Sequence, residues 1–173
     1  MNRVDVLDGV ISNAGINKRQ LTKYLKADDM QLILQTNLIS PILLVKNLLK
    51  RKKLNNCSSI VFTSSIAAFH SSVGDGVYSA TKGGISSFAR VLALELGGNK
   101  IRVNSIQPGM VRTSLLNHGP LSEDDYQKDE QRYPLGRYGK PEEVAYAAIY
   151  LLSDAAQWIT GTNLVIDGGI SLI

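Results

Sequence analysis

Two kinds of apolar segment alternate along the chain. Short runs rich in β-branched residues are typical of buried strands, whereas longer runs with an apolar residue every three or four positions are typical of helices. The pattern predicts strands over residues 4–11, 59–62, 101–106 and 163–166. It predicts helices over residues 28–53, 77–96 and 141–152. Because strands and helices alternate, we expect an α/β fold, a doubly wound parallel sheet whose right-handed crossovers place helices on both faces.

Local signals refine the first predicted helix. Asp28 is a candidate N-cap, with Gln31 three residues later where a capping partner would lie. Pro41 has no N–H to donate to the carbonyl of Asn37, four residues earlier. We therefore expect a kink at this point and an Asn37 carbonyl that is free to bind a water molecule.

The two long helices are apolar on more than one side. In the second, Val91 and Leu94 lie outside the stripe that runs through Ile85 and Leu92. A helix at the surface of a monomer needs only one apolar stripe. We therefore expect a homo-oligomer whose subunits meet through helices 28–53 and 77–96. Burial inside a larger monomer is the alternative.

Composition limits the class of protein. Hydrophobic residues make up 44% and charged residues 20% of the 173 residues, which fits one globular domain and excludes disordered and collagen-like chains. The single cysteine, Cys57, excludes an internal disulfide. The most apolar stretch, residues 32–45, is short and contains polar residues, and Asp5 and Asp8 stand where a signal peptide needs apolar ones. We expect a soluble cytoplasmic protein with no membrane partner.

Nucleic acid and metal ions are not indicated as partners. The net charge of +4 is too small to indicate a nucleic-acid partner by itself. The basic run 50–53 ends a predicted helix, where cations complement the helix dipole, and this explanation is favoured over nucleic-acid binding. His70, His118 and Cys57 are isolated and lack the spacing of metal ligands.

Tyr78 and Lys82 are the strongest candidates for chemistry. They are four residues apart on a predicted helix, so both side chains lie on one face. A phenol with a pKa of about 10 is a poor acid or base at neutral pH, and a neighbouring ammonium lowers that pKa. Ser65 follows a predicted strand, at the edge where parallel sheets bind ligands. A Tyr-x-x-x-Lys pair alone also occurs by chance.

Six features, in the same order, resemble the short-chain dehydrogenase/reductase family. They are Asn13-Ala14-Gly15 after a strand, Asn37 in the next helix, Ser65 thirteen residues before Tyr78, Tyr78-x-x-x-Lys82, Pro108-Gly109, and Gly161-x-x-Leu164-x-x-Asp167-Gly168-Gly169. Segment 134–144 is most similar to the 3-oxoacyl-carrier-protein reductase type. The resemblance covers the whole chain. It implies one domain over residues 1–173, a partial Rossmann-like sheet made of the family's C-terminal four strands and their helices.

The resemblance implies four catalytic residues. Tyr78 would be the general acid that protonates a carbonyl during reduction, or the base in the reverse direction. Ser65 would polarise the carbonyl oxygen, and Lys82 would lower the pKa of Tyr78 and hold the nicotinamide ribose. Asn37 would hold a water molecule through its backbone carbonyl.

A nicotinamide cofactor, NAD or NADP, is also implied, with no indication of which. Tyr78 and Lys82 would contact it together with residues from two loops, namely Asn13, Ala14, Gly15, Pro108, Gly109, Val111 and Thr113. The substrate would be a small carbonyl or alcohol, and residues 113–135 would form a flap over it.

One part of the family's pattern is missing from this sequence. The family begins with a strand, a Gly-rich turn and a helix that receives the pyrophosphate, but neither G-x-x-x-G-x-G nor G-x-G-x-x-G occurs among the 173 residues. We therefore expect a truncated domain, shorter by about 80 residues. Two functions stay open, namely an oxidoreductase that transfers hydride between a carbonyl and an alcohol, and a non-catalytic remnant or assembly subunit that cannot bind a dinucleotide by itself.

Overall fold

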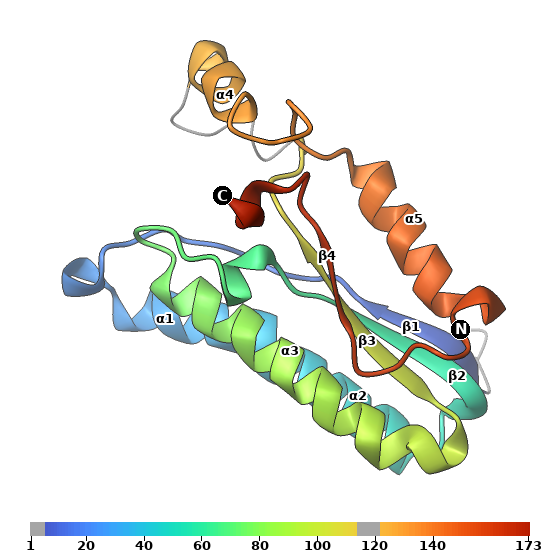
Figure 1. The fold of residues 1–173 in the computed structure, drawn as a ribbon. Helices are drawn as coiled ribbons and strands as arrows, with labels where there is room; N and C mark the ends of the chain where they lie inside the picture. Colours follow the sequence, from blue (N-terminus) through green and yellow to red (C-terminus); the bar gives the residue numbers. More distant parts are fainter. Residues whose placement is uncertain (1–5, 114–121) are drawn as a thin grey trace.

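The four strands of the protein form one parallel sheet (Figure 1). The computed structural model describes residues 6–113 and 122–173, so residues 4 and 5 of the first predicted strand lie outside it. The strands are β1 (Leu7–Ser12), β2 (Leu54–Thr63), β3 (Arg102–Pro108) and β4 (Asn163–Ile166), in the order β1-β2-β3-β4. Every adjacent pair is parallel. The predicted α/β parallel sheet is confirmed.

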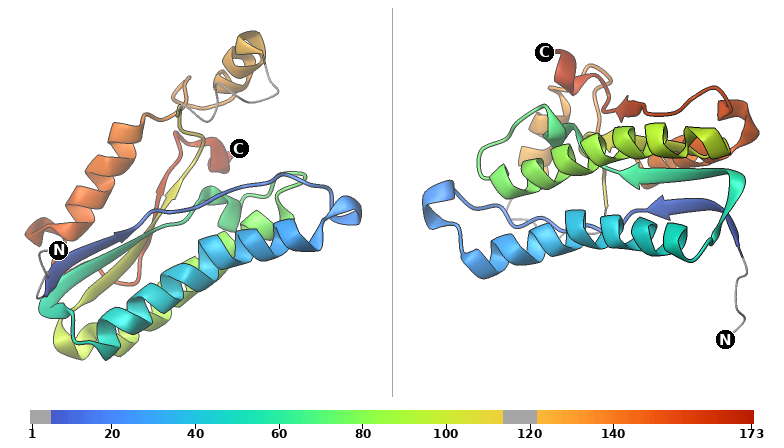
Figure 2. Two further views of the ribbon diagram at one scale, coloured as in Figure 1. Left: turned by 180° about the vertical axis from the view of Figure 1, so that it is seen from behind. Right: turned by 90° about the horizontal axis from the view of Figure 1, so that it is seen from below.

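Helices cover both faces of this sheet. They are α1 (Ala27–Leu34), α2 (Ser40–Lys50), α3 (Gly76–Leu96) and α5 (Pro141–Leu152), whereas α4 (Glu123–Glu130) lies beyond the carboxyl edge of the sheet. Alternate residues of β2 point to opposite faces, as the pleat requires. Ile60 and Phe62 belong to the apolar core shared with α2 and α3, whereas Val61 belongs to the core shared with α5. Figure 2 shows α5 on the opposite side of the sheet from α3.

The first helix differs from its prediction at its N-cap and in the segment around Asn37 and Pro41. Lys26, in extended conformation, is the N-cap of α1 without a side-chain capping bond, so the prediction of Asp28 as N-cap is wrong. Asp28 lies instead in the first turn, where a carboxylate favours the helix dipole. Between α1 and α2 the chain forms a π-helical turn (Gln35–Ile39) rather than a simple proline kink. The N–H of Ser40 donates to the carbonyl of Gln35, five residues earlier.

By length and composition alone, this helical stretch is sufficient to cross a membrane. It runs for 24 residues from Ala27 to Lys50 with a mean hydropathy of 1.5 in its most apolar part. A helix that packs against a sheet passes the same test, and here Ile33 and Val45 are fully buried. One such helix is weak evidence for a membrane span, and the absence of a membrane partner stays a prediction.

The third crossover has the opposite hand to the other two. The strands follow one another across the sheet in sequence order, so each crossover steps in the same direction. The helices of the first two crossovers pack on one face, and α5 packs on the other. Right-handed crossovers that all step in one direction would place every helix on one face of the sheet. The expectation of right-handed crossovers is therefore wrong for the step from β3 to β4. α5 instead buries the second face, where Val61 and Ile106 would otherwise be exposed.

A buried arginine fastens α5 to the sheet. Arg102 of β3 is only 8% exposed, and its guanidinium donates to the carbonyls of Leu151, Leu152 and Ser153 at 2.6, 3.2 and 3.1 Å. The last carbonyls of a helix have no partner within the helix, and they form the negative end of its dipole. Arg102 therefore satisfies several of these carbonyls at once.

Replacing Arg102 by Met tests this anchor. We expect the free energy of unfolding to fall by about 2–3 kcal/mol, since charge-assisted hydrogen bonds are lost and buried carbonyls lose their donor. Chemical denaturation would measure the change. Arg90→Met is the matched control, because exposed Arg90 donates only to Ser87 within the described residues. Equal stabilities of the two variants would contradict the anchoring role.

Candidate active site

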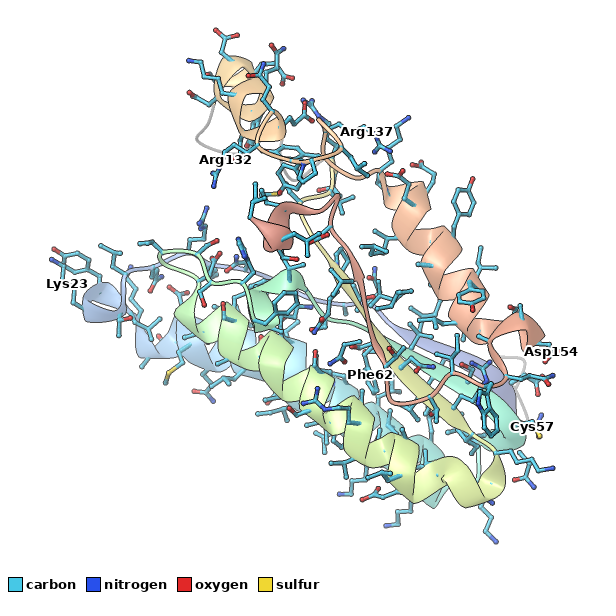
Figure 3. All side chains as sticks on the ribbon, in the orientation of Figure 1. Lys23, Cys57, Phe62, Arg132, Arg137 and Asp154 are labelled. Carbon is cyan, nitrogen blue, oxygen red and sulfur yellow. The ribbon has the colours of Figure 1, made fainter. Side chains whose placement is uncertain are left out.

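Three loops that leave the sheet at its carboxyl edge bring the candidate residues together. Segment 13–15 follows β1, Ser65 follows β2, and Pro108-Gly109 ends β3. α3 supplies Tyr78 and Lys82 to the same edge. Cys57 and Asp154 lie at the other end of the sheet (Figure 3), so neither side chain belongs to this site.

Ser65, Tyr78 and Lys82 form the centre of the site. The hydroxyls of Ser65 and Tyr78 are hydrogen-bonded to each other. The Ser65 Oγ also accepts from the backbone N–H of Ala67 at 3.1 Å, which fixes its position at the start of a short 3-10 turn. The Lys82 Nζ lies 5.5 Å from the centre of the Tyr78 ring. The structure thus brings three of the four implied catalytic residues together.

The pKa values of this group differ from the sequence expectation. Burial raises the pKa of Tyr78 above 10.0, the Ser65 hydrogen bond works against this rise, and the charge of Asp75 adds to it. The pKa of Tyr78 thus lies above its ordinary value, and a lowering of that pKa by Lys82 stays a prediction. Burial also lowers the pKa of Lys82 to about 8. At neutral pH Tyr78 is therefore a neutral phenol that retains its proton, and most of Lys82 is charged.

Lys82 is buried and directed at the end of β2. Its side chain is 4% exposed, and its ammonium donates to the carbonyl of Thr63 at 2.8 Å. An ammonium carries three N–H donors. Within the described part of the chain, this is the one hydrogen bond that the Lys82 ammonium makes. Two donors are thus left for another acceptor.

Asn37 acts through its side chain, a role that the sequence did not suggest. Its amide nitrogen donates to the carbonyl of Ile16 at 2.8 Å, and its amide oxygen accepts from the N–H of Ile16 at 2.9 Å. The amide nitrogen also reaches the Thr81 hydroxyl at 3.3 Å, and that hydroxyl donates to the carbonyl of Tyr78 at 2.7 Å. Asn37 thereby connects the loop after β1 to the helix that carries Tyr78. Water binding by its carbonyl stays a prediction.

Gly15 lies directly beside these polar groups. A Cβ atom at Gly15 would lie 3.4 Å from the Lys82 Nζ and 3.5 Å from the Asn37 Oδ1. Asn13 and Ala14 precede it on the same exposed connection. Since the buried ammonium has free donors next to an exposed backbone, this corner fits the nicotinamide ribose that the family resemblance implies. The sequence contains no Gly-rich loop for the pyrophosphate.

The loop after β3 approaches the end of β4. The N–H of Gly109 donates to the carbonyl of Ile166 at 3.1 Å, and a Cβ at Gly109 would lie 2.9 Å from the Cα of Asp167. Only glycine fits this approach without a shift of the backbone. Further along, Val111 forms a bridge with Gly139, and exposed Thr113 is the last described residue before the gap. The structure thus gathers Pro108 and Gly109 at the site more closely than Thr113.

A cavity of about 560 Å³ opens beside the Ser65–Tyr78 pair. Asp125, Tyr126 and Asp129 of α4 line it from the opposite side. Residues 122–135 of the predicted flap thus lie at the cavity, while 114–121 lie outside the described residues. Their role as a substrate flap stays a prediction.

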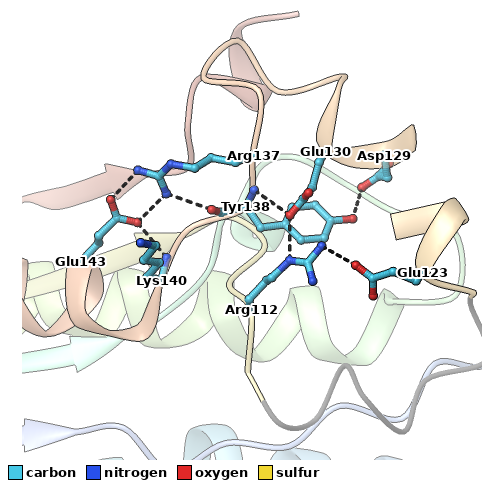
Figure 4. A network of polar contacts seen from close by, with 8 residues as sticks. All are labelled: Arg112, Glu123, Asp129, Glu130, Arg137, Tyr138, Lys140 and Glu143. Atoms are coloured by element: carbon cyan, nitrogen blue, oxygen red, sulfur yellow. Dashed lines mark hydrogen bonds and ion pairs between the residues drawn. The ribbon is translucent and has the colours of Figure 1, made fainter. Parts of the chain in front are cut away.

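Polar contacts hold α4 in this position (Figure 4). The Arg112 guanidinium donates to Glu130 at 2.9 Å and to Glu123 at 3.0 Å, and the Tyr138 hydroxyl donates to Asp129 at 2.7 Å. Both glutamates and the aspartate belong to α4. Because Arg112 lies three residues beyond Gly109, these ion pairs connect the helix above the cavity to the loop at its base.

Comparison with known proteins supplies the family. A family model described as Enoyl-(Acyl carrier protein) reductase matches residues 1–171. The chain is 40% identical over 163 residues to 3-oxoacyl-[acyl-carrier-protein] reductase of Mus musculus, covering 94% of this chain and 66% of that protein. It is 36% identical over 169 residues to the FabG reductase of Aquifex aeolicus, covering 98% and 67%. The chain thus spans about two thirds of the length of these relatives.

Solved structures agree with this result. A short-chain dehydrogenase family protein from Francisella tularensis superposes with a TM-score of 0.90 at 32% identity, covering 97% of this chain and 72% of that one. A structure from Agrobacterium tumefaciens that contains bound NADP has a TM-score of 0.88 at 27% identity, covering 96% and 68%. Fold and sequence together define a Rossmann-like domain of the oxidoreductase class. The chain belongs to the short-chain dehydrogenase/reductase family.

The buried lysine predicts a pH-dependent stability. The folded-state pKa of Lys82 is about 8 and its ordinary value is 10.5, so between these values the unfolded chain binds a proton that the folded chain does not. Stability therefore rises with pH in this window. From about pH 7 to about pH 9.5, we expect wild type to gain about 2 kcal/mol in unfolding free energy relative to Lys82→Met. Denaturant titrations at several pH values would measure this gain, and parallel profiles would contradict it.

Proposed function

We propose that this protein is a nicotinamide-dependent oxidoreductase that transfers hydride between its cofactor and a carbonyl or alcohol substrate. The observation that carries the proposal is the hydrogen-bonded pair of Ser65 and Tyr78 on the wall of the cavity of about 560 Å³, with the buried ammonium of Lys82 beside it. Two hydroxyls that converge on one cavity fit the polarisation and protonation of a substrate oxygen.

Each side chain has a defined task in this reaction. The bound cofactor supplies or receives the hydride. In reduction, Tyr78 donates its proton to the carbonyl oxygen, and its raised pKa keeps that proton in place until charge develops on the oxygen. Ser65 donates a hydrogen bond to the same oxygen. Lys82 stabilises the phenolate that is left, and its two unused donors hold the ribose hydroxyls.

The cofactor site proposed here covers the nicotinamide half of the dinucleotide. Besides Tyr78 and Lys82, it would include the two loops at the sheet edge, which contribute Asn13, Ala14, Gly15, Pro108, Gly109, Val111 and Thr113. The relative with bound NADP supports a nicotinamide dinucleotide for this chain without deciding between NAD and NADP.

Two relatives named 3-oxoacyl-[acyl-carrier-protein] reductase suggest the substrate to test first. We propose a 3-oxoacyl thioester, whose ketone would meet Ser65 and Tyr78 while residues 113–135 cover it. The reaction would take place in the cytoplasm. The turnover assay below tests this substrate.

A non-catalytic assembly subunit is the second candidate. Large apolar side chains that the long helices leave exposed, such as Leu94 at 85%, support it, since they fit a contact between subunits. Such a chain would retain the fold and the helix surfaces without turnover. The two candidates differ in whether the chain binds a dinucleotide.

Cofactor binding and a Tyr78→Phe substitution distinguish the candidates. Fluorescence titration of the chain with NADH and NADPH should show saturable binding of at least one of them. Tyr78→Phe, which keeps the ring, should still bind it, whereas kcat for a 3-oxoacyl thioester should fall by about 10²-fold or more because the general acid is lost. Wild type without binding or turnover would favour the assembly subunit, and retained turnover in Tyr78→Phe would overturn the role of Tyr78.

A homo-oligomer through the long helices is part of the proposal. Large apolar side chains on α1, α2, α3 and the π-helical turn remain exposed in the single chain, namely Leu32 at 46%, Ile39 at 40%, Leu43 at 41%, Val91 at 51% and Leu94 at 85%. They lie on the two helices whose second apolar stripes predicted an interface. Contact with the same helices of another copy would remove them from water.

Leu94→Glu tests the interface. We expect light scattering to show a smaller species than wild type, because a carboxylate at this position would lose its hydration in the contact. Leu172→Glu is the matched control, since Leu172 is also 85% exposed but lies near the C-terminus. A monomeric wild type, or the same change in both variants, would contradict the proposed interface.

A further inference from the structure

A chain of buried polar side chains lies behind the active site. Ser64 at the end of β2, Ser86 on α3 and Gln107 on β3 are 2%, 3% and 4% exposed. The amide nitrogen of Gln107 donates to the Ser86 hydroxyl at 3.1 Å, and the Ser64 and Ser86 hydroxyls lie 2.8 Å apart. These contacts join two neighbouring strands and the helix that carries the catalytic candidates.

The carbonyl of Lys82 is the acceptor at the centre of this group. The Ser64 hydroxyl lies 2.8 Å from it and the Ser86 hydroxyl 2.9 Å. Thr63, the residue next to Ser64, accepts from the Lys82 ammonium at 2.8 Å. Two consecutive residues of one strand thus hold both ends of the same lysine, its backbone and its charged group.

The number of serine hydroxyl protons shows that the Lys82 carbonyl always accepts a hydrogen bond from Ser64 or Ser86. Ser64 and Ser86 carry one O–H each, whereas three contacts join the two hydroxyls and the carbonyl. If either hydroxyl donates to the other, the second still donates to the carbonyl. Gln107 donates to Ser86 in every case, which leaves the Ser86 proton free for Ser64 or Lys82. The carbonyl therefore accepts at least one hydroxyl in every fully bonded arrangement.

These polar groups are expensive to bury without partners. The same helix face carries Ile85, Ala89 and Leu92, which form ordinary apolar core. Ser59 shows that a buried serine of β2 also has other uses, since its hydroxyl donates to the carbonyl of Leu151 on α5 at 2.9 Å. The convergence of Ser64, Ser86 and Gln107 on the single residue Lys82 thus distinguishes them from the surrounding core.

We infer that Ser64, Ser86 and Gln107 are positioning residues that fix the Lys82 ammonium in the active site by holding its backbone carbonyl. The inference rests on the proposed function only where it gives the Lys82 ammonium a role in cofactor binding and catalysis. The placement itself is a property of the folded chain and needs no cofactor. Within α3 the Lys82 carbonyl also accepts the N–H of Ser86, so the side chains add the link from the helix to β2 and β3. If that link is lost, the first turns of α3 can shift relative to β2, and the ammonium loses its alignment with the Thr63 carbonyl.

The pKa of Lys82 measures this placement directly. In wild type, burial holds that pKa at about 8, and a side chain released toward water returns toward 10.5. We would titrate isotopically labelled lysine side chains by NMR in wild type, Ser64→Ala, and the double variant Ser64→Ala/Ser86→Ala. We expect the pKa to rise in Ser64→Ala, which removes the hydrogen bond from the end of β2 to the Lys82 carbonyl, and to rise further in the double variant. Ser64→Thr, which keeps a hydroxyl, should keep the wild-type value.

Ser59→Ala is the matched control. Ser59 is equally buried in the same strand but bonds to α5 on the other face, so its loss should leave the Lys82 pKa unchanged. An unchanged pKa in the alanine variants, or an equal rise in Ser59→Ala, would overturn the inference. If the double variant does not fold, Ser64→Ala alone decides by the same criterion, since Ser64 joins the end of β2 to the Lys82 carbonyl. Since the measurement requires no turnover, failure of the proposed function would be seen separately, in the dinucleotide titration.

Discussion

The burial of one ammonium group determines much of the arrangement at the carboxyl edge of the sheet. A charged lysine is stable in a protein interior only where acceptors meet it, and here the end of β2 supplies one through the Thr63 carbonyl. That bond joins α3 to the end of β2. Gly15 then has to lack a large side chain, since even a Cβ would contact the ammonium. Asn37 holds the neighbouring backbone through Ile16. The site is therefore organised outward from Lys82.

The architecture around this centre divides the chain between two cores. One core lies under α2 and α3 and includes Ile60 and Phe62 of β2, and the other lies under α5 and includes Val61. The catalytic candidates come from the first side and from the loops above it. α5, held by Arg102, completes the second side and leads to β4, whose end meets Gly109. The packing of α5 on the second face of the sheet thus helps the loop after β3 to approach the site.

The sequence predicted the elements and the central residues because both depend on local patterns. Alternating apolar periods located the four strands, and the spacing from Ser65 through Tyr78 to Lys82 picked out three side chains that the structure brings together. The side-chain role of Asn37 could not be predicted, since its partner Ile16 is 21 residues away and is met only in the folded chain. The rise in the pKa of Tyr78 could not be predicted because burial, a property of the tertiary structure, dominates it. The hand of the third crossover likewise depends on which face of the folded sheet still has exposed apolar residues.

The π-helical turn between α1 and α2 has a geometric consequence for the whole helix. Its buried residues, Ile33, Asn37, Pro41 and Val45, recur every four positions. In an α-helix of 3.6 residues per turn, three such steps rotate the side chain by about 120° away from its starting direction. The wider turn absorbs part of that rotation, so one line of side chains stays in phase with the sheet from end to end. Deletion of a single residue in this turn would restore α-helical winding and separate Asn37 and Ile33 from the face that Val45 occupies. The length of this segment, to the residue, is thus as constrained as the identity of its amino acids.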